Sequence, residues 1–132
     1  MRSPHPQKPT SLNYASMMIA FSMIMAMIGL AISYSRNEEL SIAYVAFLAA
    51  IGGTAITNLR YLLDLEKGKP GVRRIHCISI VIQLAALTYA HSAGLLNPFL
   101  TIAVIFDVMA LVLMYYPTTT HWLESVRYHD DA

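Results

Sequence analysis

Charged residues are scarce in this sequence. Asp, Glu, Lys and Arg make up 13% of the 132 residues, whereas 56% are hydrophobic. A soluble domain of this length could not bury so many apolar side chains, because small domains keep a large surface for their volume. The composition therefore predicts a protein that lies in a lipid bilayer.

Cysteine is almost absent, with Cys77 as its single occurrence. One thiol excludes an internal disulfide framework and a zinc site built from cysteines, and Cys77 is expected to be a small buried apolar residue. The sequence also lacks a nucleophile elbow, a metalloprotease helix and a glycine-rich phosphate loop. We therefore predict neither an enzymatic activity nor a cofactor.

Basic residues are few, and they are concentrated in one place. Five of the nine lie in a short segment: Arg60, Lys67, Lys69, Arg73 and Arg74. No continuous basic stripe remains, which argues against a nucleic-acid partner. Short basic loops stay on the cytoplasmic side when a chain is inserted into a membrane, so this segment predicts the orientation of its neighbours.

Four apolar segments are long enough to cross a bilayer. They cover residues 12–35, 40–63, 75–96 and 98–116. Asn97 and Pro98 separate the last two, since asparagine is a good helix N-cap and proline is well tolerated in the first turn. The predicted fold class is all-α, an integral membrane four-helix bundle.

Short polar segments flank these spans. Residues 1–10 are predicted to be a disordered cytoplasmic arm, and residues 118–132 a cytoplasmic tail. Within that tail Trp122, Leu123 and Val126 are expected to lay a short apolar face on the membrane surface. Four spans put both termini on the side of the basic loop, where eight Lys and Arg residues then face one on the other side. Both termini are therefore predicted to be cytoplasmic, in the inner membrane of the cell.

Asp107 is the acidic residue predicted to lie deepest in the membrane, roughly 14 Å from the cytoplasmic boundary at helical rise. An ionised carboxylate at that depth costs several kcal/mol unless it is paired, protonated or hydrated, so it should face the bundle interior. Counting inward from the same side places one polar residue of each other span at a similar depth. The predicted buried polar layer is Asp107, Gln83, Thr54 and Ser22.

Two interpretations of this layer stay open. It is either a proton or cation site or a hydrogen-bonded clamp that fixes helix register. His76 and His91 do not extend it, because they lie near opposite ends of the third span, more than roughly 20 Å apart at helical rise. They cannot bind one metal ion within a single chain.

Small residues crowd the middle of the second span. Ala49 and Gly53 have the four-residue spacing that allows two helix backbones to approach closely. The predicted helix-packing seam is Ala46, Ala49, Gly52 and Gly53.

The glycine-containing basic loop and the aliphatic last span that runs into residues 116–122 resemble a loose group of small bacterial four-span inner-membrane proteins. This resemblance implies the topology and no activity. Asp107 is not part of it.

Three functions remain open. An accessory or interaction subunit of a larger membrane complex is favoured, because almost no mass lies outside the predicted spans. Its partners would be the lipid bilayer and other membrane subunits or further copies of itself. A homo-oligomeric channel or proton- or cation-coupled transporter built on Asp107 is the second, and a membrane immunity or lysis-related protein is the third.

Overall fold

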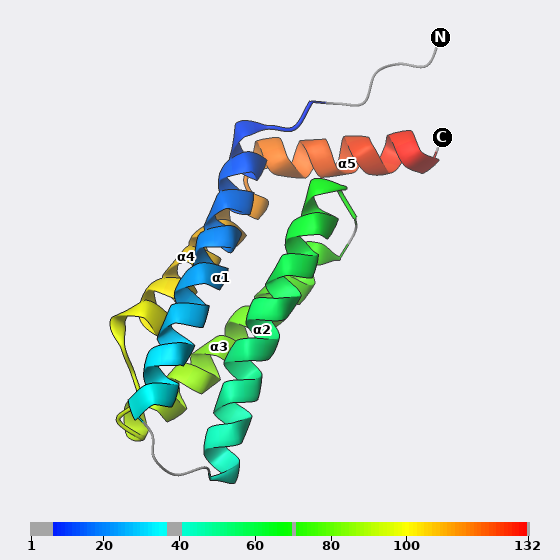
Figure 1. Cartoon of the computed structure of the whole chain (residues 1–132). Helices are drawn as coiled ribbons and strands as arrows, with labels where there is room; N and C mark the ends of the chain where they lie inside the picture. Colours follow the sequence, from blue (N-terminus) through cyan, green and yellow to red (C-terminus); the bar gives the residue numbers. More distant parts are fainter. Residues whose placement is uncertain (1–6, 37–40, 70, 132) are drawn as a thin grey trace.

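The structure, a computed structural model, describes residues 7–36, 41–69 and 71–131. These residues form helices and connections, with no strand among them. The helices, drawn in Figure 1, are α1 (Thr10–Arg36), α2 (Ile42–Glu66), α3 (Val72–Ser92), α4 (Pro98–Met114) and α5 (Pro117–Asp131). The predicted all-helical fold is confirmed.

Three of these helices, α1, α2 and α3, are each long and apolar enough to cross a membrane. α4 meets the same criterion together with α5, from which it is bent by 65°. Large apolar side chains also cover the outer surface, as Ile56 and Val112 illustrate with exposed fractions of 74% and 63%. Such a surface is unfavourable in water and favourable against lipid, so the chain is a helical membrane protein with three or four candidate spans.

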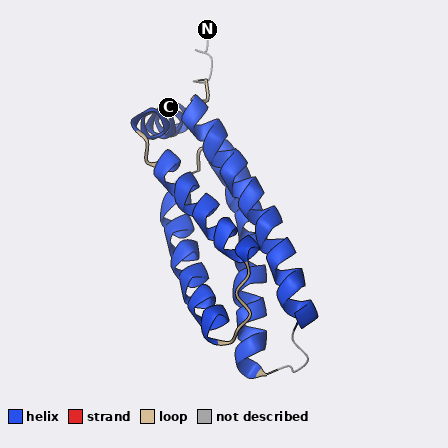
Figure 2. Ribbon diagram, turned by 90° about the vertical axis from the view of Figure 1, so that its left-hand side faces the viewer, coloured by secondary structure: helices blue, strands red, loops and turns tan. Residues whose placement is uncertain are grey.

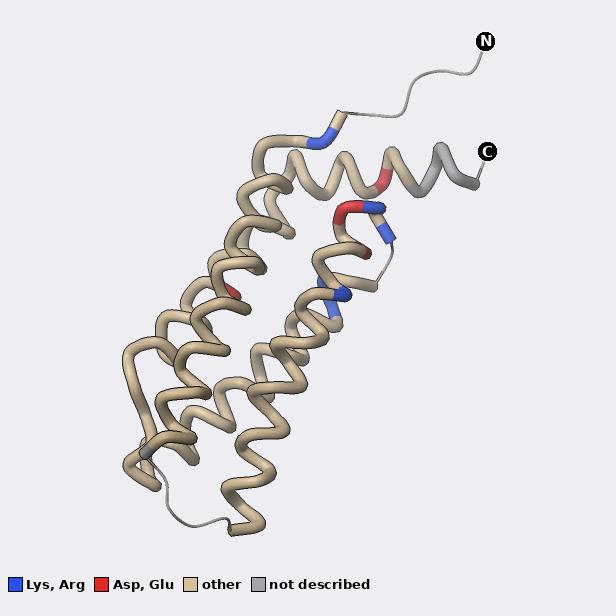
Figure 3. The backbone as a smooth tube through the Cα atoms, in the orientation of Figure 1, with Lys and Arg blue, Asp and Glu red and all other residues tan. Residues whose placement is uncertain are grey.

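The four long helices pack side by side, and α5 lies across one end of them (Figures 1 and 2). α1 packs most extensively against α4 and next against α2, while α3 contacts α2 and α4. The end that holds α5, residues 7–9 and the α2–α3 connection is called the α5 end below. The Lys and Arg residues coloured in Figure 3, and most of the coloured Asp and Glu residues, gather there.

Helix boundaries follow local capping chemistry. The side chain of Asn97 accepts hydrogen bonds from the backbone N–H groups of Phe99 at 3.1 Å and Leu100 at 3.3 Å, so it caps α4 as the sequence predicts. α3 departs from its predicted span at both ends. It begins at Val72, directly after Gly71 with φ of 85°, and it ends at Ser92, before the turn that contains Gly94.

The closest helix–helix contact permitted by a small residue lies between α1 and α4, and not at the predicted seam on α2. A Cβ atom at Gly29 of α1 would lie 2.8 Å from the Cγ atom of Leu100 on α4, so this glycine permits the α1–α4 contact. Of the predicted seam on α2, Ala46, Ala49 and Gly53 are exposed. A Cβ atom at Gly53 would meet nothing within 4 Å, and one at Gly52 only Leu30 at 3.8 Å.

The row of small residues Ala46, Ala49, Gly52 and Gly53 is therefore not a packing seam within the chain. Larger residues of α2 occupy the interface with the other helices instead. Tyr44, Phe47 and Ile51 turn inward from α2 and are nearly fully buried. Burying these large side chains removes more apolar surface than burying alanines would. The row consequently faces outward and remains available to something other than this chain.

The tail is a helix that packs on the bundle rather than on the membrane surface, which corrects the expectation for its apolar face. Trp122 and Val126 are both 7% exposed and belong to a hydrophobic cluster with Leu65 and Val72. A Cβ atom at Gly68, whose φ is 70°, would lie 2.9 Å from Val126 Cγ1. α5 is thus held against the α2–α3 connection.

Polar contacts join the N-terminal part of the described chain to the end of α2. Lys8 forms an ion pair with Glu66, whose carboxylate also accepts a hydrogen bond of 2.8 Å from Ser16. Of the arm predicted to be disordered, residues 1–6 lie outside the described part of the chain. Cys77, expected to be buried, is exposed on the outer face of α3.

Candidate functional site

Asp107 lies in the middle of the bundle and is completely buried, with 0% of its surface exposed. It belongs to the inward stripe of α4, which otherwise consists of the apolar residues Leu100, Ala103, Val104, Ala110 and Met114. Because residues three and four apart share one helix face, Asp107 cannot turn outward without exposing this apolar stripe in its place. The carboxylate is therefore held in the core.

His76 of α3 is the nearest titratable neighbour of Asp107. Its Nε2 atom lies 2.9 Å from the backbone carbonyl oxygen of Asp107 and 4.0 Å from Oδ1 of the carboxylate. The shorter distance makes the carbonyl the hydrogen-bond acceptor, so Nε2 carries a proton. The other ring nitrogen, Nδ1, is buried and has no hydrogen-bond partner among the described residues.

Asn58 of α2 faces the carboxylate from another side. Its Nδ2 atom lies 3.4 Å from both Oδ1 and Oδ2 of Asp107, which exceeds the usual range of about 2.7–3.2 Å for such hydrogen bonds. Its Oδ1 atom is buried without a hydrogen-bond partner in the described structure. Asn58 thus brings one poorly satisfied amide to the site.

Ser22 of α1 and Gln83 of α3 complete the polar shell around the carboxylate. Both side chains lie near the carboxylate of Asp107. The hydroxyl of Ser22 also donates to the backbone carbonyl of Ala103 at 2.9 Å, and Gln83 Nε2 donates to Ser79 at 3.3 Å. All of α1 to α4 therefore contribute a polar group at one depth.

The structure brings together three members of the predicted polar layer, Asp107, Gln83 and Ser22. Thr54 is buried but does not join them, because its hydroxyl donates to the carbonyl of Ile51 on its own helix at 2.9 Å. Asn58 takes that place. Asn58 lies one helical turn after Thr54, on the same buried face of α2. Helical periodicity could therefore have identified this position from the sequence.

His76 is the other residue that sequence reasoning missed. α3 begins one turn earlier than its predicted start, so His76 lies inside the bundle and not at its boundary. His76, Ser79 and Gln83 are spaced as one helix face, and all three are buried. That spacing is the signal that could have revealed the residue.

The predicted topology determinants all lie at or near the α5 end, close to residues 7–9. Arg60 and Lys69 pair with Asp64, at 4.0 Å and 3.4 Å. Arg73 donates to Thr120 at 3.1 Å and lies 4.6 Å from the centre of the Tyr115 ring. Lys67 and Arg74 are exposed beside them.

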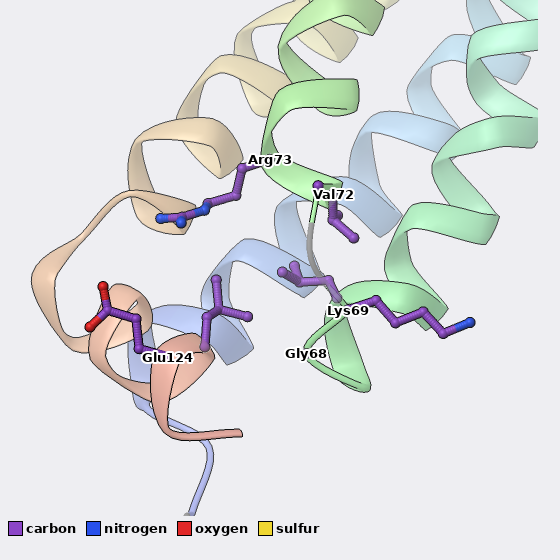
Figure 4. A pocket seen from close by; sticks show the side chains of 8 residues that line it. Gly68, Lys69, Val72, Arg73 and Glu124 are labelled. Atoms are coloured by element: carbon purple, nitrogen blue, oxygen red, sulfur yellow. The ribbon is translucent and has the colours of Figure 1, made fainter. Parts of the chain in front are cut away.

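Figure 4 shows a pocket of about 140 Å³ between the α2–α3 connection and α5. The charged ends of Lys69 and Arg73 point away from each other in this view, consistent with their separate partners. Glu124 adds a negative charge to the lining. The pocket therefore does not present its cations to an anionic ligand.

A second, larger hollow lies between α2 and α3. It has a volume of about 400 Å³ and an almost wholly apolar lining. The lining residues are Ala43, Ala46, Phe47, Ala50, Ile82, Ala85, Ala86 and Tyr89. We call this hollow the alanine groove, and in Figure 1 the two helices separate toward the Ile42 end of α2, where it lies.

Comparisons with known proteins identify no relative. No protein-family description matches the chain, and neither a curated protein nor a solved structure is significantly similar to it.

Within the described residues, no three His, Cys, Asp or Glu side chains come together as they do in transition-metal sites.

Proposed function

We propose that this chain is a small non-enzymatic protein of the inner membrane that acts as an accessory or interaction subunit of a larger membrane complex. The observation that supports this function is the alanine groove between α2 and α3. We propose that a transmembrane helix of a partner protein docks there.

The walls of the groove suit a helix. Ala43, Ala46 and Ala50 recur on one face of α2, and Ala85 and Ala86 face them from α3. Small side chains let helix backbones approach closely, which is the main source of helix association where lipid replaces water. Ala46 also joins the groove to the outward row of Ala49 and Gly53, so the small-residue surface extends beyond the hollow.

The remaining parts of the chain favour an interaction role over an independent activity. Outside the four long helices the described chain consists of short connections and α5, and α5 packs on the bundle through Trp122 and Val126. We propose that the α5 end faces the cytoplasm, because all described Lys residues and the Arg residues of the α2–α3 region gather there.

Site-specific photo-crosslinking tests the docking. A photo-reactive residue in place of Ala85 should crosslink to a partner in the native membrane, whereas the same residue in place of Ala31, an exposed alanine of α1, should not. Ala46→Leu should abolish the adduct by filling the groove, and Ala31→Leu should leave it intact. Equal crosslinking from both faces, or an adduct that survives Ala46→Leu, would refute docking in the groove.

A channel or a proton- or cation-coupled transporter is the second candidate. The complete burial of His76 and Asp107 beside each other favours it, since intramembrane acids and histidines form relays in transporters. Reconstituted protein should then pass protons or cations, and Asp107→Asn should abolish that flux while the protein stays folded. Flux that is unchanged by the substitution would eliminate this candidate.

A further inference from the structure

We propose that the outward surface around Arg60 of α2 and Arg74 of α3 binds the headgroups of anionic phospholipids. Both residues lie toward the α5 end of these helices, outside the alanine groove. Binding there requires neither the partner nor the orientation proposed above, because phospholipid headgroups cover both faces of a bilayer. Lipid binding and docking in the groove can therefore fail independently.

Helical periodicity places the two arginines on one outward face of the α2–α3 pair. Arg60 lies about four helical turns after Ala46 on α2. Arg74 lies about three turns before Ala85 on α3. Ala46 and Ala85 both line the alanine groove. The face that is hollow and apolar at one end therefore carries two guanidinium groups toward the other end.

Each arginine belongs to a stripe of exposed apolar side chains. On α2, Ile56 and Leu63 lie on the same face as Arg60, one turn before it and one turn after it. On α3, Ile78 lies one turn after Arg74. The three apolar side chains are all more than half exposed. In a helical membrane protein such stripes face the acyl chains of the lipid, so lipid molecules are the neighbours of both arginines.

The side chain of Arg60 extends along α2 toward the α5 end. Its Nε atom lies 4.0 Å from Asp64, which is one helical turn nearer to that end. A long basic side chain that starts among lipid-facing residues reaches the polar boundary in this way and keeps its charge out of the hydrocarbon. The guanidinium group of Arg60 is thereby brought to the level of the headgroups.

Exposed tyrosines mark the same level near the start of α3. Tyr115 and Tyr116 directly follow α4, and both side chains are about half exposed. Arg73, the neighbour of Arg74 in the chain, lies 4.6 Å from the centre of the Tyr115 ring. Tyrosine is enriched where a membrane protein passes through the headgroup region. The first turn of α3, which contains Arg74, therefore lies at the height of lipid phosphates.

The positive charge at this surface is not balanced by the described part of the chain. The side chain of Arg60 is 81% exposed, and its acidic neighbour Asp64 lies closer to Lys69, at 3.4 Å. Arg74 is exposed and has no ion pair or hydrogen bond with a described side chain. No acidic residue lies in the first turn of α3. Asp64 balances one of the three basic side chains, so two positive charges remain for an external anion.

A phospholipid headgroup has the chemistry that these arginines require. Phosphate oxygens match the parallel N–H groups of a guanidinium, which binds phosphate in a bidentate manner. The phosphate also lies at the membrane boundary, directly above acyl chains that cover the apolar stripes. A lipid of net negative charge is favoured over a zwitterionic one, because each basic residue near an anionic membrane surface increases binding by roughly fivefold.

Thermal unfolding of the purified full-length protein in a mild uncharged detergent tests the surface. Phosphatidylglycerol is added stepwise and is compared with phosphatidylcholine and with inorganic phosphate. A ligand that binds only the folded state raises the Tm by mass action. The Tm should therefore rise at lower concentrations of phosphatidylglycerol than of phosphatidylcholine, and inorganic phosphate should not raise it.

Matched variants identify the arginines. Arg60→Gln and Arg74→Gln each remove one charge from an exposed side chain, so the fold should be retained. Each should increase the phosphatidylglycerol concentration at half of the Tm rise by roughly fivefold, and the double variant should no longer distinguish the two lipids. Lys67→Gln removes the same charge from an exposed residue beyond the end of α2, outside both stripes, and should leave that concentration unchanged.

Native mass measurement of the same samples gives a second readout, which does not depend on unfolding. The wild type and Lys67→Gln should retain bound phosphatidylglycerol, and each arginine variant should retain less. If the double variant does not fold, the lipid retained by the two single variants decides the matter.

Three results would overturn the proposal. The first is a wild-type Tm that responds equally to the two lipids. The second is a preference for phosphatidylglycerol that persists in the arginine variants, or that Lys67→Gln weakens as much as they do. The third is an equal rise of the Tm with inorganic phosphate, which would make the ligand a free anion.

Discussion

The imidazole of His76 is hydrogen bonded to the backbone of Asp107, with Nε2 2.9 Å from the carbonyl oxygen, and not to the carboxylate 4.0 Å away. This contact ties the second turn of α3 to the middle of α4 through a main-chain atom. It should therefore survive a change of the Asp107 side chain. The packing role of His76 and the chemistry of the carboxylate are separable by mutation.

Replacing His76 should destabilise the bundle whatever occupies position 107. His76→Leu removes the cross-helix hydrogen bond to that carbonyl and should lower the free energy of unfolding by about 1–3 kcal/mol. The same loss is expected in the Asp107→Asn background, because the backbone acceptor is unchanged. Denaturant unfolding in detergent measures both, and a loss that disappears in the double variant would show that His76 acts on the carboxylate.

Docking of α5 depends on Gly68 more than on Gly71, although both have positive φ. Alanine at either position would have to adopt a left-handed backbone conformation, which destabilises the folded state by about 1–2 kcal/mol. At Gly68 the new Cβ atom would also press on Val126 and Trp122, while at Gly71 it would meet nothing within 4 Å. Gly68→Ala should therefore displace α5, and Gly71→Ala should not.

Trp122 reports on this displacement, because it is the single tryptophan of the chain and its side chain is buried between α5 and the bundle. Its emission should shift to longer wavelength, and its quenching by acrylamide should increase, in Gly68→Ala alone. Equal spectra for the two variants would mean that the contact with Gly68 does not hold α5 in place.

The crossing of α1 and α4 depends on Gly29. In Gly29→Ala the Cβ atom would lie 2.8 Å from Leu100 Cγ and 3.0 Å from the Leu100 backbone nitrogen, so the helices must move apart at a cost of about 1–3 kcal/mol. Gly53→Ala is the matched control, since that position is open and alanine favours helix by up to about 1 kcal/mol. Destabilisation by both changes, measured by thermal unfolding, would contradict this assignment of the close contact.

The proposed orientation can be tested with a thiol reagent that does not cross membranes. In a Cys77→Ser background, Ser41→Cys marks the end opposite to α5, and Ser125→Cys marks α5 itself. In intact cells only Ser41→Cys should be labelled, and Ser125→Cys should react after permeabilisation. The reverse pattern would place both described chain ends outside the cytoplasm.

The sequence was sufficient to predict those features that depend on local chemistry or on long uncharged runs. The helical class, the break at Asn97 and Pro98, and the inward direction of Asp107 all follow from single segments. Features that depend on the rotation of a helix about its axis were not predicted. α2 turns Ala46, Ala49 and Gly53 outward, because the larger side chains of Tyr44, Phe47 and Ile51 occupy the interior. The sequence of this segment alone does not show which of its faces is buried.

The depth of His76 and the position of α5 were missed for a related reason. α3 starts at Val72 because Gly71 adopts a positive φ, and a shift of one turn carries His76 into the core. The apolar face of the tail suited a membrane surface as well as a protein surface, and only the close contact of Val126 and Trp122 with Gly68 distinguishes the two. Both features require the relative placement of segments far apart in the chain.

The most direct test of the proposed interaction role is the mass of the complex that this chain forms in its own membrane. Extraction in a mild detergent, followed by native mass measurement, should show the wild type in a stoichiometric complex with a larger membrane protein. Ala46→Leu should release it from that complex, and Ala31→Leu should not. A wild-type chain that runs only as a monomer or as a homo-oligomer would contradict the account.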